Sequence, residues 1–353
     1  MTSLEDLLEA VVQSGVPGVV ALAAGPGTSW RGGAGLADVE IGARLTPDHR
    51  FRVGSVTKLF VAAAVLQLVG EGALDLDDEV GPIADGVTLR QLLNHTSGLP
   101  DYYDDIESVI EPFRSDPSYR PTLTPRDALA VVQGKPRLFP PGEGWSYSGG
   151  NYLVLGLIVE ETTGATLGEE LRDRIIDALG LQATELPDDV RAPSGIARGY
   201  LPAENPLLPS AGPGPVDVTD IQPFGWGGGE MVSTAHDVAR FLQALLGGEL
   251  LPPHLRAEML TTVVSDWEES DGYGLGIEQV SSLMERAESR CGSAWGHLGF
   301  AMGYTTIALS SESGDRQVVI CANTLVMSDE AWDALGGLTW ACYCEGDHVQ
   351  PVH

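Results

Sequence analysis

Basic residues are scarce in this sequence. Its 353 residues include 20 Lys and Arg against 50 Asp and Glu, which gives a formal net charge of −30 at pH 7. A surface this acidic repels the phosphates of nucleic acids and the head groups of anionic lipids. We therefore expect no nucleic-acid partner and no docking on an anionic membrane, and we interpret the charge mainly as a determinant of solubility.

Long apolar runs are also missing. No stretch reaches the roughly 18 apolar residues that a membrane span requires, so none is predicted. Residues 2–6 carry neither the basic nor the apolar region of a signal peptide, and the apolar residues between positions 4 and 12 follow a helical stripe instead. The expectation is a cytoplasmic protein, or a secreted one if a leader has been removed.

Cysteine is sparse as well, with four residues at Cys291, Cys321, Cys342 and Cys344. These are too few and too clustered for a fold built on disulfides. Cys291 could pair with Cys342 or with Cys344, although a reducing cytoplasm would disfavour either bond. No spacing of Cys and His is typical of a metal site, and no metal is expected.

The order of the predicted elements indicates an α+β fold. A first helix is followed by strands near 18–23 and 32–37, and the C-terminal part has strands at 304–309 and 317–322 before a last helix. We predict an antiparallel sheet flanked by helices from both termini. Residues 1–70 and 225–353 would form this sheet domain, residues 71–224 an inserted helical region, and the active site would lie between them.

One apolar helix begins beside a serine and a lysine. Residues 59–69 are apolar on all sides, which is typical of a buried helix, and Ser55 and Lys58 occupy its first turns on one face. Burial would lower the pKa of Lys58 and let it take a proton from Ser55. Backbone N–H groups at the helix start would face an oxyanion. The alternative is that Ser55 only caps the helix and Lys58 reaches solvent.

Two further stretches place polar side chains where they could reach a cleft. Tyr147 lies between a Pro/Gly turn and an apolar helix, and His297 lies between glycines before a β-rich segment. Taken singly, each is more often a packing residue. Together with Ser55 and Lys58 they complete a set of candidate catalytic residues.

Four motifs occur in order along the chain: Phe-Arg-Val-Gly-Ser-Val-Thr-Lys, Leu-Leu-Asn-His-Thr-Ser-Gly-Leu, Pro-Gly-x-x-Trp-Ser-Tyr-Ser and Gly-His-x-Gly-Phe. This set closely resembles the serine β-lactamase and D-alanyl-D-alanine peptidase superfamily, in particular soluble D-Ala-D-Ala carboxypeptidases, class C β-lactamases and related esterases. The resemblance covers nearly the whole chain. The family fold, an antiparallel sheet with flanking helices and a helical region, agrees with the pattern above.

The resemblance implies a role for each matching residue. Ser55 would be the acylated nucleophile and Lys58 would share its proton. Tyr147 would act as the general base in acylation and relay a proton to the leaving group, and His297 would support Tyr147 and bind substrate electrostatically. The N–H groups of Ser55 and Phe300 would form the oxyanion hole. No cofactor is implied.

The sequence departs from the family pattern where substrate is recognised. Gly149 replaces the asparagine that normally binds the substrate's amide side chain, and Asn151 follows two residues later. Leu298 and Phe300 flank Gly299 where carboxypeptidases carry hydroxyl residues for a free carboxylate. Gly149, Leu298, Gly299 and Phe300 would line the substrate site, whereas Asn151 need not face it, and Trp226, Tyr102 and Tyr103 could wall it.

Both departures leave the acylation residues intact and change recognition. We therefore predict a serine hydrolase or acyltransferase that acts on peptide-like amides, esters or thioesters. The alternatives are a genuine D-Ala-D-Ala carboxypeptidase or β-lactamase of the cell envelope, and a slowly acylated penicillin-binding sensor domain. The sequence leaves the acyl acceptor and the oligomeric state open.

Overall fold

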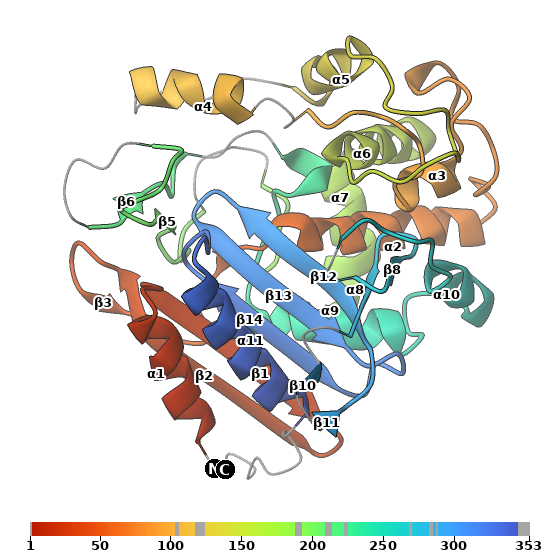
Figure 1. The fold of residues 1–353 in the computed structure, drawn as a ribbon. Helices are drawn as coiled ribbons and strands as arrows, with labels where there is room; N and C mark the ends of the chain where they lie inside the picture. Colours follow the sequence, from red (N-terminus) through yellow and green to blue (C-terminus); the bar gives the residue numbers. More distant parts are fainter. Residues whose placement is uncertain are drawn as a thin grey trace.

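The computed structural model describes residues 2–102, 106–116, 124–187, 193–208, 214–221, 225–267, 270–281, 285–286 and 289–344. Its centre is an eight-stranded antiparallel sheet in the order β3-β2-β1-β14-β13-β12-β9-β8 (Figure 1). These strands span Gly18–Gly25 (β1), Thr28–Asp38 (β2), Ala43–Arg44 (β3), Gly272–Tyr273 (β8), Glu278–Val280 (β9), Ala294–Ala301 (β12), Tyr304–Ser310 (β13) and Gln317–Ala322 (β14). Because β1 pairs with β14, one sheet joins both ends of the chain, as predicted.

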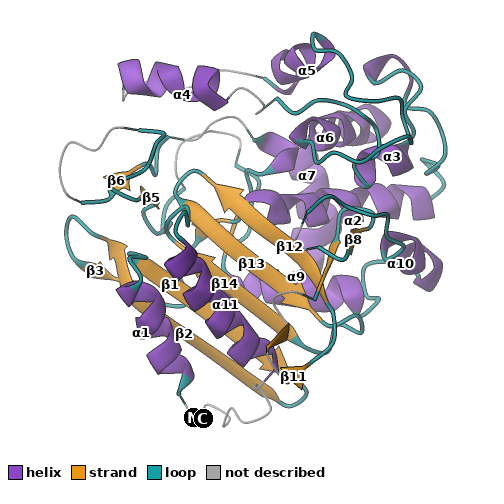
Figure 2. Cartoon of the chain, in the orientation of Figure 1, coloured by secondary structure: helices purple, strands orange, loops and turns teal. Residues whose placement is uncertain are grey.

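Helices cover both faces of this sheet. On one face lie α1 (Leu4–Gln13) and α11 (Asp329–Cys344) (Figure 2). Their apolar side chains pack on those of β1, β13 and β14. The other face packs against α2 (Thr57–Gly70) and α9 (Ala235–Leu246). Phe60 of α2 and Phe241 of α9 stack with ring centroids 3.6 Å apart, which ties the two helices together in the core. The predicted α+β fold is confirmed.

The α2 helix is buried on all sides, as its sequence predicts. Its residues from Thr57 to Leu66 are all buried, so no face of these turns meets solvent. Burial of its apolar side chains on every face stabilises this helix, as tertiary packing does for most helices in proteins. It is therefore a rigid base for the residues at its N-terminus.

The remaining helices lie above the sheet and to its right in the view of Figure 1. Several begin with a capping box, in which a Ser or Thr side chain and a residue three positions later bond each other's backbone N–H; Thr88 with Gln91 and Thr124 with Asp127 are two examples. Among the described residues, the full set of helices outside the two faces of the sheet is α3 (Leu89–Leu93), α4 (Ile106–Ser115), α5 (Pro125–Gln133), α6 (Gly149–Thr163), α7 (Leu167–Leu171), α8 (Asp177–Leu179) and α10 (Pro253–Met259).

Short elements complete the described chain. The 3₁₀ turns are η1 (Gly54–Val56), η2 (Gly81–Ile83) and η4 (Trp226–Gly228), and η3 (Arg172–Ile176) is a π-helical turn. Three two-stranded ribbons pair β4 (Phe51–Arg52) with β7 (Val232–Ser233), β5 (Tyr200–Leu201) with β6 (Val216–Asp217), and β10 (Glu285–Arg286) with β11 (Ser289–Arg290). The division into a sheet domain and an inserted helical region stays a prediction.

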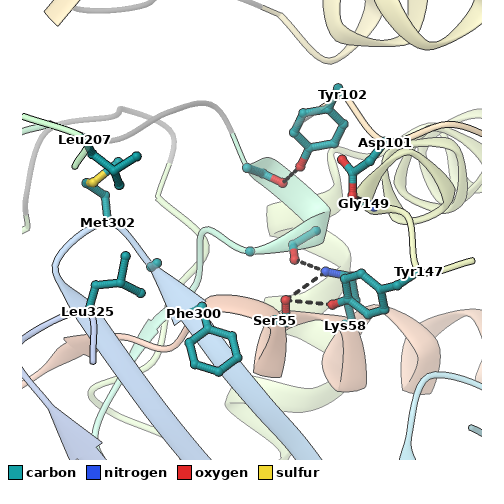
Figure 3. Close-up of a pocket in the computed structure, with 14 residues that line it drawn as sticks. Ser55, Lys58, Asp101, Tyr102, Tyr147, Gly149, Leu207, Phe300, Met302 and Leu325 are labelled. Carbon is teal, nitrogen blue, oxygen red and sulfur yellow. Dashed lines mark hydrogen bonds between the residues drawn. The ribbon is translucent and has the colours of Figure 1, made fainter. Parts of the chain in front are cut away.

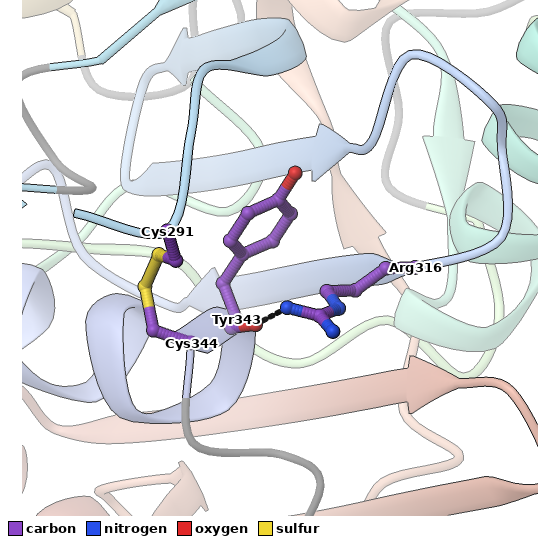
Figure 4. Close-up of a disulfide and its surroundings, with 4 residues drawn as sticks. All are labelled: Cys291, Arg316, Tyr343 and Cys344. Atoms are coloured by element: carbon purple, nitrogen blue, oxygen red, sulfur yellow. Dashed lines mark hydrogen bonds between the residues drawn. A yellow bond between two sulfur atoms is a disulfide. The ribbon is translucent and has the colours of Figure 1, made fainter.

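Cys291 is joined to Cys344 by a disulfide, with their Cα atoms 5.6 Å apart (Figure 4). The bond connects the segment before β12 to the C-terminal end of α11, where the Arg316 guanidinium also donates to the main-chain oxygen of Tyr343 at 3.1 Å. Cys321 and Cys342 are buried free thiols. The structure thus selects one of the two pairings that the sequence left open.

Within the described ranges, no helix combines the length and the apolar character needed to cross a bilayer.

Candidate active site

Ser55 lies in the η1 turn, one turn before α2 proper. The preceding residue, Gly54, has φ +54°, and a Cβ atom there would lie 2.5 Å from the main-chain nitrogen of Phe300. Glycine therefore has two reasons to occupy position 54, since it accepts the left-handed backbone and lets β12 approach closely. This close approach places Ser55 next to the C-terminal end of β12.

Two side chains converge on the Ser55 hydroxyl (Figure 3). Lys58 Nζ donates to Ser55 Oγ at 3.0 Å, and the Tyr147 hydroxyl donates to the same oxygen at 2.8 Å. Lys58 Nζ also donates to the carbonyl oxygen of Gly228 at 2.5 Å. These bonds bring together α2, the loop before α6 and η4, three segments that are distant in sequence.

Burial controls the protonation of this group. Lys58 is 2% exposed, and desolvation lowers its pKa to about 7, although the carboxylates of Asp101 and Glu278 partly offset the effect. Desolvation raises the pKa of Tyr147 well above 10, so its phenol stays protonated at neutral pH. Lys58 can therefore exchange a proton near pH 7, and Tyr147 is a hydrogen-bond donor.

A pocket of about 290 Å³ opens above these side chains. Its lining residues, several of which Figure 3 labels, are Ser55, Lys58, Asp101, Tyr102, Tyr147, Gly149, Leu207, Gly225, Gly228, Gly229, Phe300, Ala301, Met302 and Leu325. Leu207, Met302 and Leu325 gather at one end and Asp101 and Tyr102 at the other, with Ser55 between them. The pocket thus has an apolar end and an end that carries a carboxylate.

Gly149 and Phe300, two of the predicted substrate-binding residues, line this pocket. The main chain of Phe300 lies next to Gly54, which places it on the same side of the pocket as Ser55. The Phe300 ring is 43% exposed and packs edge-on against Trp332 of α11. The oxyanion hole formed by the N–H groups of Ser55 and Phe300 stays a prediction.

His297 lies outside the pocket, contrary to the prediction that it binds substrate. Its side chain is fully buried, with Nε2 3.0 Å from the Tyr273 hydroxyl and Nδ1 3.1 Å from Glu278 Oε1. Burial lowers the pKa of His297 to about 3, so the imidazole is neutral. Its ring centroid lies 6.1 Å from that of Tyr147, so any support for Tyr147 acts through packing rather than a direct hydrogen bond.

Three other predicted substrate-binding residues do not line the pocket either. Side chains alternate along β12, so Leu298 points to the face of the sheet opposite to that of His297. It lies in the core beneath α1 and α11. Gly299 is a packing position, since a Cβ there would lie 2.0 Å from the Val53 carbonyl oxygen. The Trp226 ring lies against α6, where it would meet a Cβ at Gly156 at 2.6 Å.

Asn151 also faces away from the pocket. Its side chain is fully buried, with Nδ2 2.9 Å from His95 Nδ1, and its Oδ1 accepts from Ser97 Oγ at 2.6 Å. The Ser148 N–H donates to the same His95 nitrogen at 3.2 Å. The Asn-His-Thr-Ser motif therefore holds the start of α6 in place, and Asn151 does not replace the asparagine missing at position 149.

Asp101 and Tyr102 occupy the space around Gly149. Asp101 Oδ2 accepts the Gly149 N–H at 2.8 Å, and the Tyr102 ring would lie 3.0 Å from a Cβ at position 149. Tyr102 was a candidate wall residue in the sequence; Tyr103 lies outside the described residues. Asp101 was missed, and the available signal was its place directly after the Asn-His-Thr-Ser-Gly-Leu-Pro motif.

No group of three or more His, Cys, Asp or Glu side chains placed to hold a metal ion occurs in the described part of the chain. The expectation that the chemistry needs no cofactor stays a prediction.

Comparison with known proteins gives consistent matches over most of the chain. The family model described as Beta-lactamase matches residues 4–337. A D-stereospecific amidohydrolase from Streptomyces sp. is 32% identical, with a TM-score of 0.79 over 97% of this chain and 98% of that one. A D-amino acid amidase from Ochrobactrum anthropi SV3, complexed with L-phenylalanine amide, is 26% identical, with a TM-score of 0.81 over 95% and 96%.

Esterase EstB from Burkholderia gladioli is 30% identical over 343 residues, which cover 83% of this chain and 86% of that protein. The matched family and these relatives agree with the observed fold. The chain belongs to the Beta-lactamase family and is a serine hydrolase of that family.

Proposed function

We propose that this hydrolase forms its acyl-enzyme on Ser55 and acts on amides, esters or thioesters of amino acids or short peptides. The observation that carries the proposal is the position of Ser55 Oγ, 3.0 Å from Lys58 Nζ and 2.8 Å from the Tyr147 hydroxyl, at the floor of a pocket. A hydroxyl next to a group that can accept its proton is the arrangement that nucleophilic catalysis requires.

In acylation, neutral Lys58 takes the Ser55 proton while Oγ attacks the substrate's carbonyl carbon. The Ser55 and Phe300 N–H groups stabilise the resulting oxyanion. When the intermediate collapses, the leaving group takes the Tyr147 proton, and the phenolate regains a proton from the Lys58 ammonium. Lys58 is then neutral again for deacylation, in which it takes a proton from the attacking water and the departing Ser55 oxygen is reprotonated.

This scheme makes Lys58 the general base in place of Tyr147, the residue that the family resemblance had suggested. The reason is electrostatic: the pKa of Tyr147 is raised well above 10 by burial, whereas that of Lys58 is lowered to about 7. A phenol with so high a pKa is a poor base at neutral pH but a suitable proton donor to a leaving amine or alkoxide.

The pocket favours leaving groups that have no free carboxylate. Among the described residues that line it, Lys58 is the only cationic side chain, and its charge is engaged by Ser55 and Gly228. A C-terminal carboxylate would lose its hydration without a matching partner. Neutral amides and esters fit better, and the D-stereospecific amidohydrolase and the D-amino acid amidase among the similar structures make derivatives of D-amino acids the first candidates.

Intact-protein mass spectrometry tests the proposal. The protein would be incubated separately with a D-phenylalanine ester, a peptide ending in D-Ala-D-Ala and a penicillin, and adducts would be mapped by proteolysis. We expect a transient adduct on the peptide that contains Ser55 from the ester, and slow or no labelling by penicillin. Rapid stoichiometric labelling by penicillin with release of D-Ala would instead identify a genuine carboxypeptidase of the cell envelope. Labelling without turnover of any substrate would identify a sensor domain.

The pH dependence of catalysis follows from Lys58. Because the lysine must be neutral to accept the Ser55 proton, kcat/KM is expected to rise about tenfold per pH unit below its pKa and to level off above about 7. Tyr147 should add no alkaline limb below pH 10, since its pKa is raised well above that value. Initial rates with an anilide that has no titratable amine and resists spontaneous hydrolysis would measure the profile between pH 5 and 9.5. A profile flat across this range would contradict the role of Lys58.

A further inference from the structure

A carboxylate sits beside the proposed nucleophile without a role in the acylation scheme. Asp101 lines the pocket together with Ser55 and Lys58. Its Oδ2 atom accepts the Gly149 N–H at 2.8 Å, and its main-chain oxygen accepts from Lys135 Nζ at 2.8 Å. These two bonds fix both the backbone and the carboxylate of Asp101, so a negative charge is held at one end of the pocket.

We propose that Asp101 binds a free, positively charged amine on the acyl part of the substrate, next to the carbonyl group that Ser55 attacks. The inference rests on the proposed acyl-enzyme function and names the class of acyl donor that the site accepts. The donor is an aminoacyl amide or ester with an unmodified amino group.

The surroundings of Gly149 support recognition of an amine rather than of an amide. Position 149 has no side chain that could bond a substrate amide, and the Tyr102 ring fills the space that such a side chain would take. The Tyr102 hydroxyl donates to the Gly225 carbonyl oxygen at 3.3 Å, so it is directed toward the protein. A carboxylate with an aromatic ring next to it suits an ammonium group, through charge and through the ring face.

The same arrangement disfavours an N-acylated substrate. An acylated amine carries no charge and keeps one N–H donor where an ammonium group has three. Its hydrogen bond to the Asp101 carboxylate would be a neutral one, which is weaker than a charge-assisted bond and offsets less of the lost hydration. Asp101 therefore favours free amines over blocked ones.

The opposite end of the pocket suits the side chain of such an aminoacyl group. Leu207, Met302 and Leu325 form an apolar cluster across Ser55 from Asp101 (Figure 3). The pocket volume of about 290 Å³ is at the small end of the range for ligand sites, which fits one aminoacyl group better than a long peptide. The amine at Asp101 and an apolar side chain at this cluster would place the carbonyl carbon near Ser55.

Matched substrates that differ only in the amine test this inference. The p-nitroanilides of D- and L-phenylalanine would be compared with the p-nitroanilide of 3-phenylpropanoic acid, which lacks the amine but keeps the side chain and leaving group. All rates would be measured at pH 7. We expect wild-type kcat/KM to be about 10- to 100-fold higher for at least one phenylalanine enantiomer than for the deamino substrate, the range for loss of a charged hydrogen bond.

The variant Asp101→Asn separates charge from structure, because its amide oxygen can still accept the Gly149 N–H. The preference for the amine should fall to within about threefold of unity in this variant. Asp78→Asn, a change at an exposed aspartate outside the pocket, should keep the wild-type preference. The measured quantity is the ratio of kcat/KM for the two substrates within each protein, so a general loss of activity does not imitate the result.

The outcomes are distinct. If Asp101→Asn keeps the wild-type ratio, Asp101 serves only the Gly149 N–H and the inference is overturned. Equal use of both substrates by the wild-type protein would also overturn it, without needing any variant, and would leave the acyl-enzyme proposal intact. If no substrate is turned over and no ester acylates Ser55, the proposed function itself fails and the inference fails with it.

Discussion

Replacement of Ser55 by alanine is expected to lower kcat/KM by about 10⁴- to 10⁶-fold, the range seen when a nucleophile that acts as a unit with its base is removed. Ser55 Oγ is the atom on which Lys58 and Tyr147 converge, at 3.0 Å and 2.8 Å. Alanine leaves both partners in place but removes the only atom between them that can form an ester. The measurement is kcat/KM for a phenylalanine anilide, together with the mass of the protein during turnover of an ester.

The acyl adduct should disappear completely in Ser55→Ala, while the protein keeps its fold as judged by circular dichroism. Ser194→Ala offers a matched control, since Ser194 is an exposed serine outside the pocket and its loss should leave activity unchanged. An adduct of undiminished amount in Ser55→Ala would place the nucleophile elsewhere and would remove the basis of the proposed mechanism.

Lys58→Met is expected to lower kcat/KM by about 10³-fold or more, because a thioether cannot take the Ser55 proton. The same change should raise stability. A lysine whose pKa is lowered from 10.5 to about 7 by burial costs the fold about 4 kcal/mol at pH 7. Loss of the bond to the Gly228 carbonyl oxygen costs about 1–3 kcal/mol in return. The net gain in unfolding free energy at pH 7 should therefore be about 1–3 kcal/mol.

The pH dependence of this gain identifies its cause. Between the folded pKa of about 7 and the unfolded value of 10.5, the unfolded wild-type chain binds more protons at Lys58 than the folded chain. Wild-type stability therefore rises with pH across this window relative to Lys58→Met, and the advantage of the variant shrinks toward pH 10. Denaturant titrations of both proteins at pH 7 and pH 9.5 would measure it. An advantage that does not change with pH would mean that the folded and unfolded chains bind the same number of protons at Lys58, and therefore that its pKa is not lowered in the folded protein.

Local patterns in the sequence were sufficient to place Ser55 next to Lys58 and to give the order of the main elements. Ser55 and Lys58 are three residues apart at the start of a helix, so their proximity follows from helix geometry alone. The apolar helix after them and the strands at both ends of the chain also follow from periodicity. The link to Tyr147 came from the motif order, since 92 residues separate it from Ser55 in the chain.

The tertiary structure decided which side chains reach the pocket. His297 and Leu298 are neighbours in sequence, and only the packing of β12 shows that one is turned toward Tyr273 and Glu278 and the other into the core beneath α1 and α11. Asp101 and Tyr102 lie between α3 and α4 in the chain and contact Gly149 at the start of α6, and no periodicity reveals this contact. Sequence spacing determines contacts within one helix or strand, whereas contacts between elements depend on how these elements pack. The residues that would recognise substrate come from different elements, so only the tertiary structure shows which of them meet at the pocket.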